Sequence, residues 1–512
     1  MANVLIISPY PLYRRWPTTP DTARIVTNAT PLTLPQLAAS LPKHKVKIYD
    51  GNAYDISLPE YAKLLRWSDI VAINIMSSFA ALNTELNVRF IRKVKSEIKI
   101  IFGGHHATFQ AEEWLSKGVD IVVRREGEIT LPEVVDVLVG GKELKKVKGI
   151  SWHLGGDIIH NPDRPFIENL DSLPMPRWDL MDFGKYHLFL RKKGYSACLE
   201  TGRGCQEHCT FCQVGPMWNH THRFKSVNRV MEEMKLLTSQ GVTKLFIVDD
   251  SYGANVDTAR QVDIYKMMRK ENFNFEWGGS FRHDYVSLNH KLLKEAAATG
   301  LKFACVGFES VEGSDLDLFN KKNISFENLD SYVREYEFLK SLGIFTFGFI
   351  VIGYPGQNED SVMRTLENAH KFCDYPLVTL YKPLPGTVAY SQTKQKGLMT
   401  KKMFYHDPFT VAVKGTKPIL AKYNRFFLRY LLSPMRLLKG FANKNYRPME
   451  TIIFKWFIGG IFKANFKNVG DFFWFIFKGR KLPEDIYIKY LCEKYLSDKN
   501  ISELVKKAKK AD

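Results

Sequence analysis

Short apolar runs alternate with amphipathic segments over two long stretches of this chain, and this alternation constrains its fold most. In the first stretch, residues 1–150, the segments 60–67 and 83–97 carry apolar side chains at helical spacing. The apolar runs that predict strands lie at residues 4–8, 46–50, 69–78, 98–104 and 119–128. Alternating strands and helices indicate a parallel, doubly wound α/β sheet. Ligands bind such a sheet at the carboxyl ends of its strands, so we expect a site near the loops 77–79 and 103–106.

The second stretch, residues 195–398, repeats the alternation. Its predicted strands lie at residues 195–202, 244–250, 273–280, 302–310, 345–353 and 376–383. Its predicted helices lie at residues 228–241, 257–271, 290–300, 329–343 and 359–372. Three of these helices end in a glycine suited to a C-cap, namely Gly241, Gly300 and Gly343. Six strand–helix units predict a partial (β/α)6 TIM-type barrel, with its chemistry at the carboxyl ends of the strands.

Three cysteines, Cys205, Cys209 and Cys212, follow the first predicted strand of this barrel in the sequence GRGCQEHCTFCQVG. Their spacing places three thiolates on one short loop, with no fourth cysteine nearby. A structural zinc site needs four protein ligands, whereas a four-iron cluster held by three thiolates keeps one iron for a non-protein ligand. The alternatives are three cysteines buried by chance, or a zinc site completed by His208 or His220.

The cysteine loop resembles that of radical S-adenosylmethionine (SAM) enzymes, in which the open iron binds the amino and carboxylate groups of SAM. The resemblance implies further SAM contacts at the strand ends that follow. Asp249 and Asp250 end the second predicted strand, and the acidic Glu309, at the end of the fourth, matches a residue that binds the ribose hydroxyls. The full set that the resemblance implies is Phe211, Asp249, Ser280, Arg282, Glu309, Gly353 and Pro355.

The run from Ile100 to Val135 resembles the cobalamin-binding domain that precedes many radical SAM cores. Its GGHHAT and RREGE segments match two loops of that family, except that Arg125 stands where a glycine is usual. The predicted cobalamin contacts are Ser77, Ser78, Gly103, Gly104, His105, His106, Glu126, Gly127 and Glu128. Residues 1–150 contain no D-x-H-x-x-G motif, so we expect no cobalt ligand from that motif. The alternative is a flavodoxin-like domain without a cofactor.

With 512 residues the chain is long enough for several domains. We predict a cobalamin-binding domain at 1–150, a proline-rich linker at 151–194 and a radical SAM core at 195–398. A basic, aromatic-rich and mostly helical region follows at 399–512. The fold class is therefore α/β: a doubly wound Rossmann-like domain, then a partial (β/α)6 TIM-type barrel, then a helical C-terminal extension.

The C-terminal region holds most of the net charge of +19, because residues 414–512 contain 22 lysines and arginines against 8 aspartates and glutamates. On a helix, Phe426, Phe427, Tyr430 and Leu431 would share one face, with Arg425, Arg429 and Arg436 flanking it. Such a face either packs against the open side of the barrel or lies peripherally on a membrane. A nucleic-acid partner is not expected, since no RNA-recognition motif is present.

Cysteine usage and hydropathy indicate a cytoplasmic protein, with peripheral contact at the inner membrane face as an option. The four cysteines outside the loop, Cys198, Cys305, Cys373 and Cys492, are scattered and do not suggest a disulfide framework. No apolar run approaches the ~20 residues that span a bilayer. The apolar N-terminal stretch predicts a buried strand and has no cleavage-site pattern.

The resemblance implies an enzyme with a 4Fe–4S cluster, SAM, cobalamin and a one-electron reductant of the flavodoxin or ferredoxin type. The preferred function is methylation of an unactivated carbon of a hydrophobic small molecule (a lipid, isoprenoid or tetrapyrrole) through a 5′-deoxyadenosyl radical. The alternatives are an oxygen-independent cyclase of the magnesium-protoporphyrin ester cyclase type and a non-catalytic cobalamin or redox sensor. The sequence selects no general base among Tyr252, His283 and Tyr381.

Overall fold

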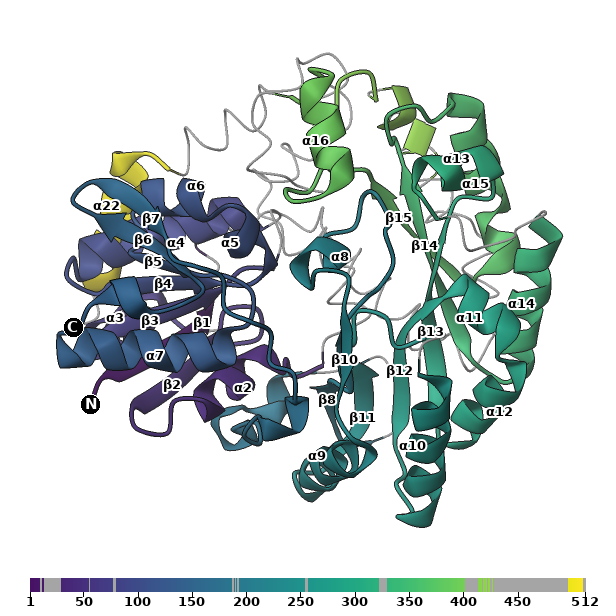
Figure 1. The fold of residues 1–512 in the computed structure, drawn as a ribbon, viewed down its shortest axis with the longest axis horizontal. Helices are drawn as coiled ribbons and strands as arrows, with labels where there is room; N and C mark the ends of the chain where they lie inside the picture. The colour runs from purple at the N-terminus through teal and green to yellow at the C-terminus, as the bar shows by residue number, and fades with distance from the viewer. Residues whose placement is uncertain are drawn as a thin grey trace.

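The structure is a computed structural model in which two α/β units face each other (Figure 1). It describes residues 1–9, 12, 29–54, 56–76, 80–186, 188, 190, 193–253, 257–321, 329–400, 413–416, 418–420, 422–423, 426 and 496–509.

The first unit is built on a seven-stranded sheet of order β2-β1-β3-β4-β5-β6-β7. Its strands are β1 (Asn3–Ser8), β2 (Lys45–Asp50), β3 (Ile70–Asn74), β4 (Lys99–Gly103), β5 (Ile121–Val123), β6 (Ile150–Leu154) and β7 (Asp157–His160). Strands β1 to β5 pair in parallel, which confirms the predicted doubly wound sheet.

Helices cover both faces of this sheet. They are α2 (Thr33–Ala39), α3 (Leu58–Trp67), α4 (Ala81–Val94), α5 (His105–Phe109), α6 (Ala111–Ser116) and α7 (Gly127–Gly140). Alternate residues of β1 point to opposite faces: Val4 and Ile6 share one core with α2 and α7, whereas Leu5 and Ile7 share another with α3 and α4.

Strands β6 and β7 extend the sheet beyond the predicted domain boundary at residue 150. They form an antiparallel hairpin, and β6 also pairs antiparallel with β5. Gly155 and Gly156 form the turn of the hairpin, with φ angles of 60° and 97° that favour glycine. The first part of the segment predicted as a linker therefore belongs to the first sheet, and the 3-10 turns η3 (Leu170–Ser172), η4 (Trp178–Leu180) and η5 (Phe183–Lys185) follow it.

The second unit is a six-stranded sheet of order β15-β14-β13-β12-β11-β8, in which every pairing is parallel. Its strands are β8 (Tyr195–Leu199), β11 (Val242–Ile247), β12 (Glu276–Arg282), β13 (Leu301–Glu309), β14 (Phe345–Ile352) and β15 (Tyr375–Leu380). The larger helices between them are α9 (Val227–Ser239), α10 (Thr258–Lys270), α12 (His290–Ala298), α14 (Leu329–Ser341) and α15 (Glu359–Phe372). The six predicted strands and five predicted helices are confirmed, and the sheet is an open, partial barrel.

Short elements lie above the carboxyl ends of these strands. A two-stranded hairpin, β9 (Gly202–Gly204) with β10 (His222–Phe224), encloses the cysteine loop and α8 (Val214–Met217). The other short helices are α11 (His283–Leu288), α13 (Gly313–Leu318) and α16 (Val388–Gln395).

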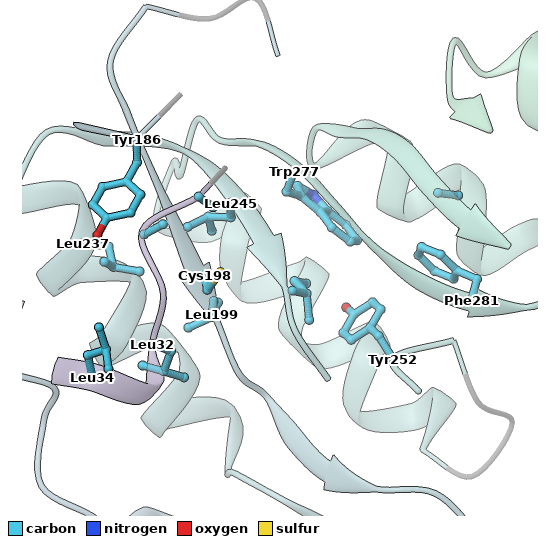
Figure 2. Packing of buried hydrophobic residues seen from close by; sticks show 14 of the residues in the cluster. Leu32, Leu34, Tyr186, Cys198, Leu199, Leu237, Leu245, Tyr252, Trp277 and Phe281 are labelled. Carbon is cyan, nitrogen blue, oxygen red and sulfur yellow. The ribbon is translucent and has the colours of Figure 1, made fainter. Parts of the chain in front are cut away.

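The two units share one hydrophobic core. Figure 2 shows Leu32 and Leu34 of the first unit beside Cys198 and Leu199 of β8. The backbone of Thr30 also binds the free edge of β8, since its N–H donates to the carbonyl of Ser196 at 3.1 Å and its carbonyl accepts from the N–H of Cys198 at 2.9 Å. The segment that leads into α2 is thus an edge partner of the barrel sheet, and this contact fixes the two units side by side.

The helix α22 (Asp498–Lys509) packs on α3 and α4 of the first unit and buries Ile501 and Ala508 there (Figure 1). Most of the predicted aromatic, basic face lies outside the described residues, including Phe427, Tyr430, Leu431, Arg425, Arg429 and Arg436. Within the part of the chain that the structure describes, no helix combines the length and the apolar character needed to cross a membrane.

Candidate functional site

A cavity of about 470 Å³ lies between the two units, where the carboxyl ends of β1, β3 and β4 face β8 and β11. Most of its lining side chains are apolar. One arm enters the first unit, since Ala72, Ile101 and Val123 of the sheet line it together with Leu34 of α2 and Leu131 of α7. The cavity is therefore lined both by the strand ends of the two units and by apolar side chains between the first sheet and helices α2 and α7.

Gly103 and Gly104 of the GGHHAT loop form part of the cavity wall. Gly104 has a φ angle of 95°, and a Cβ atom there would lie 2.5 Å from both Asn74 Oδ1 and the carbonyl oxygen of Ile75. The backbone therefore approaches the end of β3 more closely than any residue with a side chain permits. Gly103 and Gly104 both line the cavity, as does Met76 just before Ser77 and Ser78, which lie outside the described residues.

The two histidines of this loop have different surroundings. His105 lines the cavity, with its ring edge-on to Trp218 of the second unit at a centroid distance of 6.3 Å. His106 is buried, and its Nδ1 accepts a hydrogen bond of 3.0 Å from Trp114 Nε1. Burial lowers the pKa of both imidazoles to about 4, so both are neutral at pH 7.

The RREGE loop, residues 124–128, has at Arg125 the left-handed backbone conformation that glycine adopts most easily. Arg125 has a φ angle of 63°, although it is not a glycine. Its guanidinium reaches across to the second unit, where Nη1 donates to the carbonyl of Met217 at 3.0 Å, and it also lies 5.0 Å from the centroid of the Phe166 ring. The arginine thus costs backbone strain and adds a contact between the units.

The carboxylates of this second loop line the cavity but already have cationic partners. Glu126 and Glu128 both accept hydrogen bonds from the guanidinium of Arg203, which belongs to β9 of the second unit. Gly127 lies between them and also lines the cavity. Sequence reasoning did not find Arg203, because an arginine on a short strand carries no local signal of a partner some 75 residues earlier in the chain.

The cysteine loop is anchored by the carboxyl ends of the later barrel strands. The hydroxyls of Thr210 and Tyr354 share a hydrogen bond of 2.9 Å, and Gln213 Nε2 donates to the carbonyl of Pro385 at 2.7 Å. Asn320 Nδ2 donates to the carbonyl of His208 at 2.9 Å. These contacts hold the loop across the sheet after β13, β14 and β15, where a barrel enzyme of this kind carries its chemistry.

The three thiols of the loop have surroundings that fit an iron–sulfur cluster. All three side chains are partly exposed, and burial raises the pKa of Cys209 to about 11 and that of Cys212 to about 12. Lys321 and Arg282 oppose this effect at Cys209 and would offset the negative charge of thiolates. The iron atoms of a cluster would offset the rest of the negative charge on the three thiolates.

Within the described part of the chain, no three His, Cys, Asp or Glu side chains are grouped closely enough to hold one metal ion. The rings of His208 and His220 stack on each other at 3.9 Å, and His220 Nδ1 donates to the carbonyl of Glu207 at 3.0 Å. In a cluster the three thiolates bind different irons, so a tight group around one ion is not required.

The two aspartates at the end of β11 have different roles in the structure. Both carboxylate oxygens of Asp249 accept from Thr201, at 2.6 Å from its N–H and 2.6 Å from its hydroxyl. Asp249 therefore fixes the start of the hairpin that leads to Cys205, and it does not line the cavity. Asp250 does line the cavity, and it accepts from the N–H of Gly204 at 3.0 Å. Burial raises the pKa of Asp250 to about 6.

Two of the predicted SAM contacts lie close to the cysteine loop. Arg282, at the end of β12, pairs with Glu207 of the loop at 3.1 Å and with Asp284 at 2.9 Å. Glu309, at the end of β13, accepts from Lys321 Nζ at 3.0 Å. The φ angle of Glu309 is 65°, a strained conformation for a residue with a side chain. Ser280, on β12, lies beside Cys305 of β13.

The remaining predicted SAM contacts lie around β14. Phe211 packs edge-on against Phe319 at a centroid distance of 5.5 Å. Gly353 directly follows β14 and has a φ angle of 76°, and a Cβ there would lie 2.8 Å from the side chain of Leu380. Pro355 lines a second cavity of about 330 Å³, together with Thr210 of the cysteine loop. All of these SAM assignments stay predictions.

The three general-base candidates are buried, and none of them lines either of these two cavities. Tyr252 donates to the hydroxyl of Tyr265 at 3.0 Å. His283 lies among aromatic rings, 4.6 Å from Tyr332, and burial lowers its pKa to about 3. Tyr381 packs on Tyr354 at 4.6 Å.

Two family models match the chain in the order of its two units. The model of the B12 binding domain matches residues 19–135, and that of the radical SAM superfamily matches residues 199–369.

Three relatives with known names are similar over most of the chain. An uncharacterized methyltransferase of Pyrococcus horikoshii is 29% identical, over 83% of this chain and 92% of the relative. The hopanoid C-3 methylase of Methylococcus capsulatus is 25% identical, over 72% and 70%. The anaerobic magnesium-protoporphyrin IX monomethyl ester cyclase of Rubrivivax gelatinosus is 23% identical, over 70% and 66%.

Two solved structures share the fold. OxsB, a cobalamin-dependent S-adenosylmethionine radical enzyme solved with aqua-cobalamin, superposes with a TM-score of 0.66 at 16% identity, over 99% of this chain and 79% of OxsB. TsrM of Kitasatospora setae, a radical S-adenosylmethionine methyltransferase solved with cobalamin and a [4Fe–4S] cluster, gives a TM-score of 0.59 at 15% identity, over 78% and 76%.

Proposed function

Since this chain belongs to the cobalamin-dependent radical SAM enzymes, we propose that it methylates an unactivated carbon atom of a hydrophobic small molecule. The cofactors of this family are a 4Fe–4S cluster, SAM and cobalamin. When bound, they supply one-electron reduction, a 5′-deoxyadenosyl radical and a transferable methyl group. The protein's contribution is to hold these groups, exclude water and orient the substrate.

Each cofactor has a set of candidate residues in the chain. Cys205, Cys209 and Cys212 would hold the cluster. Arg282 and Glu309, both close to the cysteine loop, would bind polar groups of SAM, because a guanidinium suits a carboxylate and a carboxylate suits hydroxyls. The glycine pair before His105 would let the backbone approach cobalamin in the cavity between the units.

One observation carries the proposal: the cavity is walled by both units at the ends of their parallel strands. On one side lies the loop of Gly104 and His105, and on the other lie Asp250 and Arg203, which adjoin the cysteine loop. A single site with walls from a B12-binding domain and a radical SAM core would allow one cofactor to give a methyl group to the substrate radical that the other cofactor generates.

The hydrophobic character of the substrate is supported by the similarity to a hopanoid C-3 methylase.

Product analysis tests the reaction. The protein is reconstituted with iron and sulfide without oxygen, then incubated with SAM, methylcobalamin and a chemical reductant. The added molecules are a hopanoid, magnesium-protoporphyrin IX monomethyl ester and, as a polar control, cytidine monophosphate. We expect 5′-deoxyadenosine, S-adenosylhomocysteine and a product in which one C–H hydrogen is replaced by a methyl group, from an apolar molecule only. Methylation of the polar control alone would contradict the hydrophobic assignment.

A pair of variants serves as the control for this assay. Cys209→Ala should lose the cluster and both nucleoside products, whereas Cys305→Ala, which removes a buried core thiol, should keep them. Continued turnover of Cys209→Ala would contradict the mechanism.

The second candidate is an oxygen-independent radical cyclisation, which the similarity to the magnesium-protoporphyrin ester cyclase favours. It predicts 5′-deoxyadenosine without S-adenosylhomocysteine, and an oxidised ester as the product. Absence of both nucleosides from a protein with an intact cluster would instead favour the non-catalytic sensor, which the enzyme relatives argue against.

We also propose two partners, a one-electron reductant of the flavodoxin or ferredoxin type and an anionic membrane surface. The reductant is tested by replacing the chemical reductant with a reduced flavodoxin and measuring 5′-deoxyadenosine. The membrane is supported by the basic residues of the last hundred positions and by Lys506, Lys507 and Lys509, which end α22. Co-sedimentation of the full chain with anionic but not with neutral vesicles is expected, and equal behaviour with both would refute it.

A further inference from the structure

One guanidinium joins three carboxylates from both units. Arg203 Nη1 donates to Glu126 Oε1 at 2.8 Å, and Arg203 Nη2 donates to Glu128 Oε1 at 2.6 Å. Its Nε donates to both oxygens of Glu200, at 2.9 and 3.0 Å. We call Arg203, Glu126, Glu128 and Glu200 the interdomain clamp. Two of its acids belong to the first unit, while the third acid and the arginine belong to the second.

The clamp is buried and its charges are balanced by neighbours. The side chain of Arg203 is only 6% exposed, and those of Glu126 and Glu128 are 5% and 10% exposed. Arg223 Nη1 also binds Glu126, at 3.0 Å, and Lys225 Nζ lies 3.8 Å from Glu200. Lys225 and Arg229 also bind Glu233, at 2.9 and 2.8 Å. Four acids thus face four cations, so the burial of these charges is compensated, but each group depends on the others.

Both ends of the clamp lie at the proposed site. Arg203 is on β9, two residues before Cys205, and the backbone of the next residue, Gly204, is held by Asp250. Glu126 and Glu128 flank Gly127 at the start of α7, in the cavity wall. Glu126 also accepts from the N–H of Ile167 at 2.8 Å, so the connecting segment is bound as well.

We propose that Arg203 is a positioning residue that fixes the distance between the cluster loop and the cobalamin-facing wall of the cavity. This inference rests on the proposed function. It also reassigns Glu126 and Glu128, whose side chains serve the clamp rather than a bound cofactor. Lysine cannot replace Arg203, because an ammonium has no planar fork that binds three carboxylates at fixed angles.

The test uses the charge-conserving variant Arg203→Lys in the reconstituted holoenzyme. Pulsed electron paramagnetic resonance measures the distance between the cobalt of cob(II)alamin and the reduced cluster, without substrate. We expect one narrow distance distribution in the wild type and a broadened one in the variant, at equal iron, sulfide and cobalamin content. A residue that only stabilises the fold would leave this distribution unchanged in the molecules that are folded.

Hydrogen exchange gives a readout that needs no cobalamin. Amide exchange in peptides covering residues 126–128 and 165–168 should accelerate about tenfold or more in Arg203→Lys, because the bond from Ile167 to Glu126 loses its support. Arg164→Lys is the matched control, since Arg164 binds Glu133 and Thr130 without reaching the second unit. It should leave the distance distribution unchanged.

The outcomes separate the two proposals. An unchanged distance distribution and unchanged exchange in Arg203→Lys overturn the clamp. If Arg203→Lys does not assemble, Glu128→Gln, which removes one arm, is measured in its place and judged by the same two readouts. If the wild type binds no cobalamin, the proposed function fails, and the exchange measurement alone decides on the clamp.

Discussion

Trp114 donates a hydrogen bond to Nδ1 of His106 at 3.0 Å, and the two rings meet edge-on at a centroid distance of 5.7 Å. This contact holds the ring of His106 in the core of the first unit, beside Trp114, while the neighbouring His105 lines the cavity. Two adjacent histidines that the sequence grouped as one binding motif therefore separate into a core residue and a cavity residue.

Alanine substitutions should separate these two roles. His105→Ala should weaken cobalamin binding and leave the urea midpoint of unfolding unchanged. His106→Ala should lower the free energy of unfolding by about 1–3 kcal/mol, because it leaves the buried indole N–H of Trp114 without its acceptor. Absorbance titration with cobalamin and urea unfolding measure the two effects. The reverse pattern would contradict the assignment.

The same histidines predict a pH dependence of stability. Burial lowers the pKa of each to about 4 in the folded chain, against an ordinary value near 6.5 in the unfolded chain. Between pH 6.5 and 4 the unfolded state binds more protons, so the free energy of unfolding falls as the pH falls. The slope reaches about 1.4 kcal/mol per pH unit for each histidine. His106→Asn should remove one of the two contributions, and parallel pH curves for variant and wild type would refute this.

Substitutions of Arg125 can separate two effects on stability: the strain of its left-handed backbone and its hydrogen bond to the second unit. Arg125→Gly and Arg125→Ala both remove the bond to Met217, but only glycine adopts the φ angle of 63° without strain. The glycine variant should therefore be more stable than the alanine variant by about 1 kcal/mol in urea unfolding. Equal stabilities would show that the left-handed conformation at this position costs nothing.

Gly104 should tolerate no side chain. In Gly104→Ala the new Cβ would lie 2.5 Å from two oxygen atoms, so the loop must move and cobalamin affinity should fall about tenfold or more. Gly141→Ala is the matched control, because Gly141 also has a positive φ angle of 62° but has open space around it. The control should lose about 1 kcal/mol of stability and no affinity. Similar affinities of the two variants would argue against a cofactor at this wall.

Local patterns in the sequence were enough to predict most of the fold. Periodicity placed the six barrel strands, and the glycines after α9, α12 and α14 mark helix ends as expected, since Gly241, Gly300 and Gly343 all have positive φ angles. These features depend on a few consecutive residues. The cysteine loop was likewise predicted from the spacing of three nearby residues, and it follows the first barrel strand, β8, as expected.

Features that depend on distant pairing could not be read in this way. The partner of Asp249 is Thr201, and the partners of Glu126 and Glu128 include Arg203, but an acid at the end of a strand has the same local sequence whether it faces a ligand or a buried cation. The hairpin of β6 and β7 had a visible turn at Gly155 and Gly156, yet its pairing with β5 depends on the tertiary fold.

The position of α22 has a consequence for how the protein matures. Its Ala508 side chain joins a hydrophobic core whose other buried members lie between Leu5 and Val122 of the first unit, those of α3 and α4 among them. During translation the first unit emerges from the ribosome long before this helix does, and until then part of its surface is uncovered. Biogenesis of the first unit therefore finishes after synthesis of the barrel, when the two units are already able to meet around their cofactors.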